Sequence, residues 1–169
     1  MLGVLDNFPQ TIHRTTCLAS LISNRKLQQT LTEALQRLNK ESVNMERIAD
    51  PLMPQCSASF EFGIAETDGF NYLDDEEANR VLKMVQKNPF ETMDFFCCLR
   101  YHRKHEDKLS PLRFDYYLLR FTFEEKTMGV LVFHERGPRH LSPEDLTDLV
   151  VSRINEVSQK KTLRLVDAC

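Results

Sequence analysis

The sequence contains no tryptophan and only five glycines among its 169 residues. Loops that cradle phosphate groups depend on closely spaced glycines, as in Gly-x-Gly-x-x-Gly, and no such pattern occurs here. The sequence also lacks the Gly-x-Ser-x-Gly segment that presents a serine nucleophile between a strand and a helix. These absences argue against nucleotide-dependent enzymes and against serine hydrolases.

Long hydrophobic runs are absent as well. A transmembrane helix needs about 20 consecutive apolar residues, and no stretch approaches that length, so we expect no membrane span. Residues 1–8 are apolar but lack the basic lead and the small-residue cleavage site of a secretory signal. The formal net charge of −3 gives no general attraction for phosphate backbones or acidic membranes. We therefore do not expect nucleic acid to be the main partner.

The cysteines are odd in number and irregularly spaced. Cys97 and Cys98 are neighbours in a predicted strand, face opposite ways and cannot easily bond to each other. With His102 and His105 they form one irregular cluster that lacks the second ligand pair of a zinc site. We expect mostly buried free thiols, an intracellular reducing compartment (cytoplasm or nucleus), no metal, no cofactor and no catalytic residue. The five cysteines are Cys17, Cys56, Cys97, Cys98 and Cys169.

The strongest positive signal is a predicted β-hairpin. Residues 114–123 (FDYYLLRFTF) are aromatic or aliphatic at nearly every position. Residues 128–133 (MGVLVF) resume the apolar run after the polar break Glu124–Thr127. Two such runs joined by a short polar loop are typical of a hairpin. Because successive side chains point to opposite faces, a strand that is apolar at both sets of positions is expected to be covered on both sides.

A well-marked amphipathic helix follows the hairpin. Ser142 can cap it, Pro143 fits the first helical position, and Glu144 and Asp145 place negative charge near the positive end of the helix dipole. Apolar residues then recur at helical spacing, which predicts one stripe against a core. These residues are Leu146, Leu149, Val150, Ile154 and Val157.

Residues 51–113 complete a predicted α+β domain. Apolar and polar residues alternate from Ala58 to Ile64, and Phe70–Leu73 can form a short return strand. Asp74–Glu77 resembles a capping box that opens a helix ending near Asn88, and residues 93–101 form another apolar strand. Consecutive strands joined by short connections predict an antiparallel sheet of about five strands with covering helices.

This order of strands and helices is similar to that of profilin-like modules, which include GAF sensor domains and longin domains. Residues 129–149 (GVLVFHERGPRHLSPEDLTDL) resemble the end of a GAF domain, where a strand, a short loop and an acid-capped helix close the fold. The resemblance implies a small-molecule sensor as an alternative function. Such a sensor would have an enclosed pocket between sheet and helices, lined by Phe60, Phe62 or Tyr117.

Residues 1–50 are predicted to form a helical arm that precedes the α+β domain of residues 51–169. A short helix is expected from Pro9 to Ile22, and a longer one from Arg25 to about Ile48. The proline-rich segment Asp50–Pro54 would end the second helix and redirect the chain. The apolar stripe of this second helix could form a short coiled coil, fit a partner's groove or pack on its own domain. The stripe is centred on Leu27, Leu31, Leu35 and Leu38.

The absence of a catalytic constellation favours a non-enzymatic protein-interaction module, a subunit or adaptor of an intracellular complex. The leucine stripe would bind a protein partner or a second copy of the chain. Arg103 and Lys104 would contact an acidic partner. They lie in the only basic cluster of the sequence, which consists of Arg100, His102, Arg103, Lys104 and His105. A nucleic-acid-associated protein that uses the same cluster is a second alternative.

Overall fold

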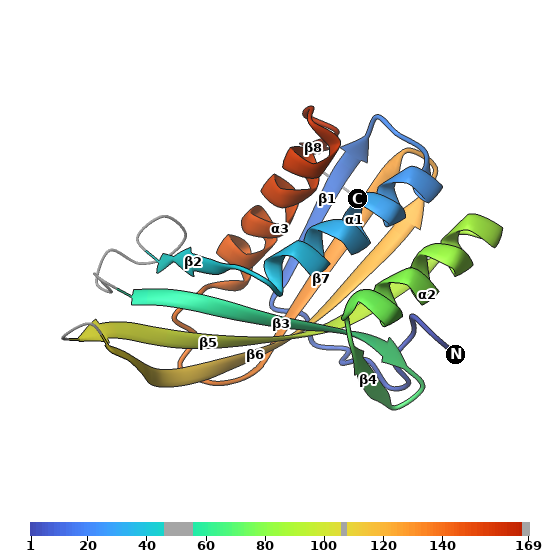
Figure 1. Ribbon diagram of the computed structural model, residues 1–169. Coiled ribbons are helices and arrows are strands. Elements are labelled where there is room, and N and C mark those ends of the chain that lie inside the picture. The colour runs from blue at the N-terminus through green and yellow to red at the C-terminus, as the bar shows by residue number, and fades with distance from the viewer. Residues whose placement is uncertain (46–55, 106–107, 167–169) are drawn as a thin grey trace.

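The computed structural model describes residues 1–45, 56–105 and 108–166, although the side chains of residues 103–113 lie outside the described part. The described residues form a strongly twisted sheet of eight antiparallel strands, and three helices lie together on one of its faces (Figure 1). The fold is therefore α+β with an open antiparallel sheet, as predicted, but the sheet is larger than the predicted five strands.

The strands follow the order β2-β3-β5-β6-β7-β1-β8, with β4 paired to the same edge of β3 as β2. The helices are α1 (Asn24–Leu38), α2 (Asp75–Lys87) and α3 (Pro143–Ser158). The strands are β1 (Arg14–Ser20), β2 (Ser42–Asn44), β3 (Cys56–Glu66), β4 (Gly69–Tyr72), β5 (Thr92–His105), β6 (Lys108–Glu124), β7 (Thr127–Arg136) and β8 (Leu163–Leu165).

The predicted β6–β7 turn and the predicted starts of α2 and α3 are confirmed. Strands β6 and β7 form the predicted hairpin, in which Glu124 pairs with Thr127. Ser142 caps α3 by accepting a hydrogen bond from the Asp145 amide at 3.0 Å, and Pro143 opens the helix. Asp74 caps α2 in the same way. Each of these features depends on residues close in sequence, which is why the sequence pattern was sufficient to predict them.

The predicted helix from Pro9 to Ile22 is wrong, because Arg14–Ser20 form strand β1 between β7 and β8. Thr16, Leu18 and Ser20 alternate toward the buried face, and the β-branched Thr15 and Thr16 favour a strand. Since β1, α1 and β2 contribute to the same sheet and core as the rest of the chain, the structure does not set these residues apart as an arm.

Helix α1 ends at Leu38, earlier than the predicted Ile48, and the chain enters β2. The Asn39 side chain helps to fix this exit, because its amide accepts from the Phe62 N–H at 2.6 Å and donates to the Phe62 carbonyl at 3.2 Å. Asn39 thus bonds to β3 between the segment that pairs with β2 and the segment that pairs with β4. Residues 46–55, with the proline-rich segment, lie outside the described residues. Near the end of the chain, Leu163–Leu165 form β8.

The core lies between the sheet and the layer of helices. Its α1 side consists of the leucine stripe, and all four leucines are fully buried. The sheet side is rich in aromatic residues, which include Phe60, Phe62, Phe95, Phe121 and Tyr117. None of the described helices is long and apolar enough to cross a membrane.

The first residues of the chain close a gap in the sheet where β3 and β5 diverge. The Gly3 amide donates to the Ala65 carbonyl at 2.7 Å, and the Asp94 amide donates to the Gly3 carbonyl at the same distance. Gly3 has a φ of +90°, and a side chain there would collide with the Phe90 ring, so glycine is required. The N-terminal segment therefore covers one end of the sheet face that carries no helix (Figure 1).

Candidate interaction surface

Strand β6 is covered by helices on one face only. Tyr117, Leu119 and Phe121 are fully buried on the helix side. Phe114 and Tyr116 alternate with them and point to the other face, where Phe114 is 40% exposed and Tyr116 is partly exposed. The expectation that this strand is covered on both sides is therefore wrong at Phe114 and Tyr116, although Leu118 on the same face is buried. The helix-free face instead presents large apolar side chains to solvent.

Strand register places these side chains in rows across the helix-free face. One row runs from Glu61 on β3 through Cys98 on β5 and Tyr116 on β6 to Arg136 on β7. Side chains in such a row are direct neighbours, about 4.5–5.5 Å apart at their Cβ atoms. The two adjacent rows are Phe96, Leu118 and Phe133 on one side and Ser59, Arg100 and Phe114 on the other.

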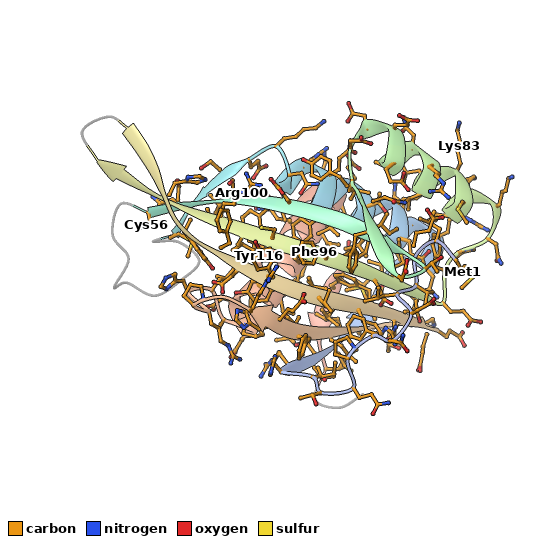
Figure 2. The ribbon with its side chains drawn as sticks, turned by 90° about the horizontal axis from the view of Figure 1, so that it is seen from below. Met1, Cys56, Lys83, Phe96, Arg100 and Tyr116 are labelled. Carbon is orange, nitrogen blue, oxygen red and sulfur yellow. The ribbon has the colours of Figure 1, made fainter. Side chains whose placement is uncertain are left out.

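Four aromatic rings contact one another in sequence across these rows. The ring centroids of Phe70 and Phe96 lie 5.3 Å apart, those of Phe96 and Tyr116 5.7 Å, and those of Tyr116 and Phe114 6.5 Å. Figure 2 shows Phe96 and Tyr116 close together near the middle of this face. Phe70 crosses β3 at Gly63, where an added Cβ would lie 3.4 Å from that of Phe70. The rings therefore form a continuous apolar strip from β4 to β6.

Two arginines lie against these rings. The Arg136 guanidinium is 4.5 Å from the centroid of Tyr116, and that of Arg100 is 5.6 Å from the centroid of Phe114. Arg100 also forms an exposed ion pair with Glu61 at 3.0 Å, whereas Arg136 has no ion pair with any described carboxylate. Such cation–π contacts hold each guanidinium over a ring. We call this set the aromatic–arginine patch; it consists of Phe70, Phe96, Phe114, Tyr116, Arg100 and Arg136.

The N-terminal segment and a buried ion pair bound the patch at one end. Asp94 is fully buried and binds Arg120 through two hydrogen bonds of 2.8 Å. Asp94 also accepts from the Leu5 amide at 2.8 Å, and Phe8 lies 4.3 Å from the Arg120 guanidinium. The Asp94–Arg120 pair therefore holds the N-terminal segment in place, and its charges are already satisfied within the chain.

Among the described residues, the most extensive polar cluster is buried on the helix side and has a structural role. The Asp115 carboxylate accepts from the Tyr101 hydroxyl at 2.5 Å, from His134 Nε2 at 2.7 Å and from the amides of Arg139 and His140. Burial raises the pKa of Tyr101 far above its usual range, so the hydroxyl stays a donor. With its carboxylate fully engaged, Asp115 anchors the loop between β7 and α3.

Gly137 makes that loop possible. Its φ is +115°, and a side chain there would collide with Asp115 and with the carbonyl of Phe114. The Tyr117 hydroxyl also donates to the Leu141 carbonyl at the end of the loop. The loop can therefore approach β6 closely only with glycine at this position.

The predicted cluster of cysteines and histidines is not a single site. Cys97 and Cys98 face opposite sides of the sheet, as expected, and burial raises the pKa of both thiols. His102 lies 3.2 Å from Ser59 Oγ on the helix-free face, while the side chain of His105 is outside the described part. Within residues 1–45, 56–105 and 108–166, no three histidine, cysteine or acidic side chains could hold a metal ion together.

The expectation of mostly free thiols holds for three of the described cysteines. Cys56, Cys97 and Cys98 are free and buried. Cys17, by contrast, is disulfide-bonded. Cys169 lies outside the described residues.

The residues predicted to contact a partner do not gather on one surface. All four leucines of the α1 stripe face the core, so a partner could reach them only if α1 left the sheet. Arg103 and Lys104 lie in β5, but their side chains are outside the described part. The structure brings Arg100, from the same basic cluster, into the aromatic–arginine patch.

The aromatics proposed to line a sensor pocket are also in the core. Phe60, Phe62 and Tyr117 are at most 1% exposed. The grooves that we find on the described surface have other linings. One of about 820 Å³ lies between α3, β1 and β8, and one of about 640 Å³ lies between the N-terminal segment and the α2–β5 connection.

Comparison with known proteins gives no family: no family model, no curated protein and no solved structure matches this chain.

The sequence did not predict this patch, although it shows the apolar and basic residues that form it. Phe114 and Tyr116 were recognised as apolar, and Arg100 was recognised as part of the only basic cluster. What was missing was the strand register, which brings Arg136 beside Tyr116 and places Phe70 against Phe96. These are contacts between residues 20 or more positions apart, which no local pattern contains.

Proposed function

We propose that the protein is a non-enzymatic interaction module, a subunit or adaptor of a protein complex, and that it binds a protein partner through the aromatic–arginine patch. The observation that carries this proposal is the continuous strip of partly exposed rings with two arginines against it. Tyrosine, phenylalanine and arginine are enriched in protein interfaces, and tyrosine and arginine dominate their binding energy.

The chemistry of the described side chains supports a binding role over a catalytic one. The Asp115 carboxylate is saturated by four donors, and the Cys97 and Cys98 thiols are disfavoured as thiolates by burial. The pair of Ser59 and His102 would need a third group to orient the imidazole, and no described carboxylate bonds to His102.

Affinity purification from the native cell with quantitative mass spectrometry tests this proposal. The double variant Phe114→Ser with Tyr116→Ser should lose partners that the wild type retains, because it removes two rings from the patch. Leu21→Ser is the matched control, since Leu21 is 63% exposed and lies in the β1–α1 connection. Circular dichroism verifies that each variant is folded. Identical sets of co-purified proteins for the double variant and the wild type would contradict the proposal.

A further inference from the structure

The aromatic–arginine patch has an excess of positive charge. It contains Arg100 and Arg136, and the only described carboxylate in contact with either is that of Glu61, on Arg100. Asp94, at the boundary of the patch, is already neutralised by Arg120. Among the described residues, the Arg136 guanidinium is therefore left without a carboxylate partner, although the whole chain has a net charge of −3.

The arginines are held ready to bind carboxylates. Contact with Tyr116 restrains the Arg136 guanidinium and reduces the side-chain entropy that binding must still overcome. A guanidinium over a ring can still use its edge, where paired N–H groups match the two oxygens of a carboxylate. Apolar side chains of the same partner could lie on Phe96 and Phe114 beside it.

We infer that the partner presents a segment in which acidic and apolar residues alternate, and that its carboxylates bind Arg136 and, in competition with Glu61, Arg100. This inference rests on the proposed function and names the chemistry of the partner. A second copy of the chain fits less well, because two such faces would bring like charges together. Single-stranded nucleic acid also fits less well, because it needs a positively charged groove along its backbone, and this patch offers two guanidiniums.

Binding of defined probes to the full chain tests the inference. The first probe is a fluorescent peptide of about eight residues in which Asp alternates with Leu; at ~3.3 Å per residue it spans the ~19 Å from β4 to β7. The second replaces each Asp by Asn. The third is a short oligothymidylate. Fluorescence polarisation gives each affinity, amide NMR shifts locate each site, and sedimentation velocity reports self-association.

We expect the Asp peptide to bind at the patch about tenfold more tightly than the Asn peptide. Arg136→Gln should remove most of this difference. Arg164→Gln, which removes an exposed arginine from β8, two strands away from β7, should leave the difference unchanged.

Three outcomes would overturn the inference. These are equal affinity for the two peptides (including no binding of either), tighter binding of the oligothymidylate at the patch, or self-association that Arg136→Gln alters. If the peptides fail but Phe114→Ser with Tyr116→Ser still loses cellular partners, the proposed function stands and only the acidic chemistry is refuted.

Discussion

Removing the Asp115 carboxylate should destabilise the protein strongly, because this one buried side chain accepts from four donors on β5, on β7 and in the loop between β7 and α3. In Asp115→Ala, the Tyr101 hydroxyl, His134 Nε2 and the amides of Arg139 and His140 all lose their acceptor. The hydrogen bonds from His134 and from the amides of Arg139 and His140 are partly buried, so water can partly replace the lost acceptor for these three donors. The Tyr101 hydroxyl is fully buried, and water cannot replace its acceptor.

The magnitude follows from the cost of an unsatisfied buried donor, which is about 1–3 kcal/mol each. The Tyr101 hydroxyl alone therefore predicts a loss of ~1–3 kcal/mol in the free energy of unfolding, and the three partly buried donors add to it. This is a large part of the 5–15 kcal/mol typical of a domain. Asp115→Asn keeps one acceptor oxygen and should lose less than Asp115→Ala. Asp68→Asn, at the turn between β3 and β4, removes a charge at an exposed position and should change stability little.

Urea unfolding followed by far-ultraviolet circular dichroism measures these differences, because the chain has no tryptophan to report by fluorescence. An Asp115→Ala variant within about 1 kcal/mol of the wild type, with the same urea dependence, would refute the reasoning. It would mean that the loop between β7 and α3 is held by packing and that the polar cluster contributes little.

Three further predictions concern other parts of the fold. Arg120→Ala leaves the buried Asp94 without its cation and should cost about 3–5 kcal/mol in urea unfolding, with larger amide NMR shifts in the N-terminal segment than elsewhere. Leu31→Asp should abolish the folded circular dichroism spectrum, because Leu31 is fully buried; a folded variant would show that α1 can leave the core. Hydrogen bonds from Arg80, and then from Asn71, lower the pKa of Glu66 to about 2, so Arg80→Gln should raise it toward 4.5 in an NMR titration. Since that pKa is depressed in the folded state, the stability lost by Arg80→Gln should be seen above pH 4.5 and should vanish as the pH falls toward 2.

The parts of the fold that were predictable from sequence are those with local causes. The β6–β7 turn, the Ser142 and Asp74 caps and the alternation in β3 each depend on residues a few positions apart. Strand β1 was mistaken for a helix because its apolar residues also fit a helical spacing over a short window. What makes it a strand is its pairing with β7, where Leu18 lies opposite Met128. That partner is more than 100 residues away in the sequence.

The candidate surface was missed for a different reason. Apolar residues at both sets of positions in β6 were taken to mean burial on both sides, which is the usual meaning in a central strand. A strand whose second face binds a partner has the same pattern, because that face is also withdrawn from water once the partner is bound. Composition alone cannot separate the two cases; the position of the helices does.

Strand β3, which is separated from β6 by β5, shows that exposed rings are not a general property of this face. On β3 the side chains on the same face are Ser57, Ser59 and Glu61, the polar set expected where a one-sided sheet meets water. On β6, Phe114 and Tyr116 break that alternation, and large exposed apolar patches typically mark binding sites. Exposed rings also promote aggregation. In the unbound protein, Phe114 and Tyr116 therefore offer no advantage over polar residues at the same positions. Their presence therefore supports the proposal that a partner covers them in a bound state.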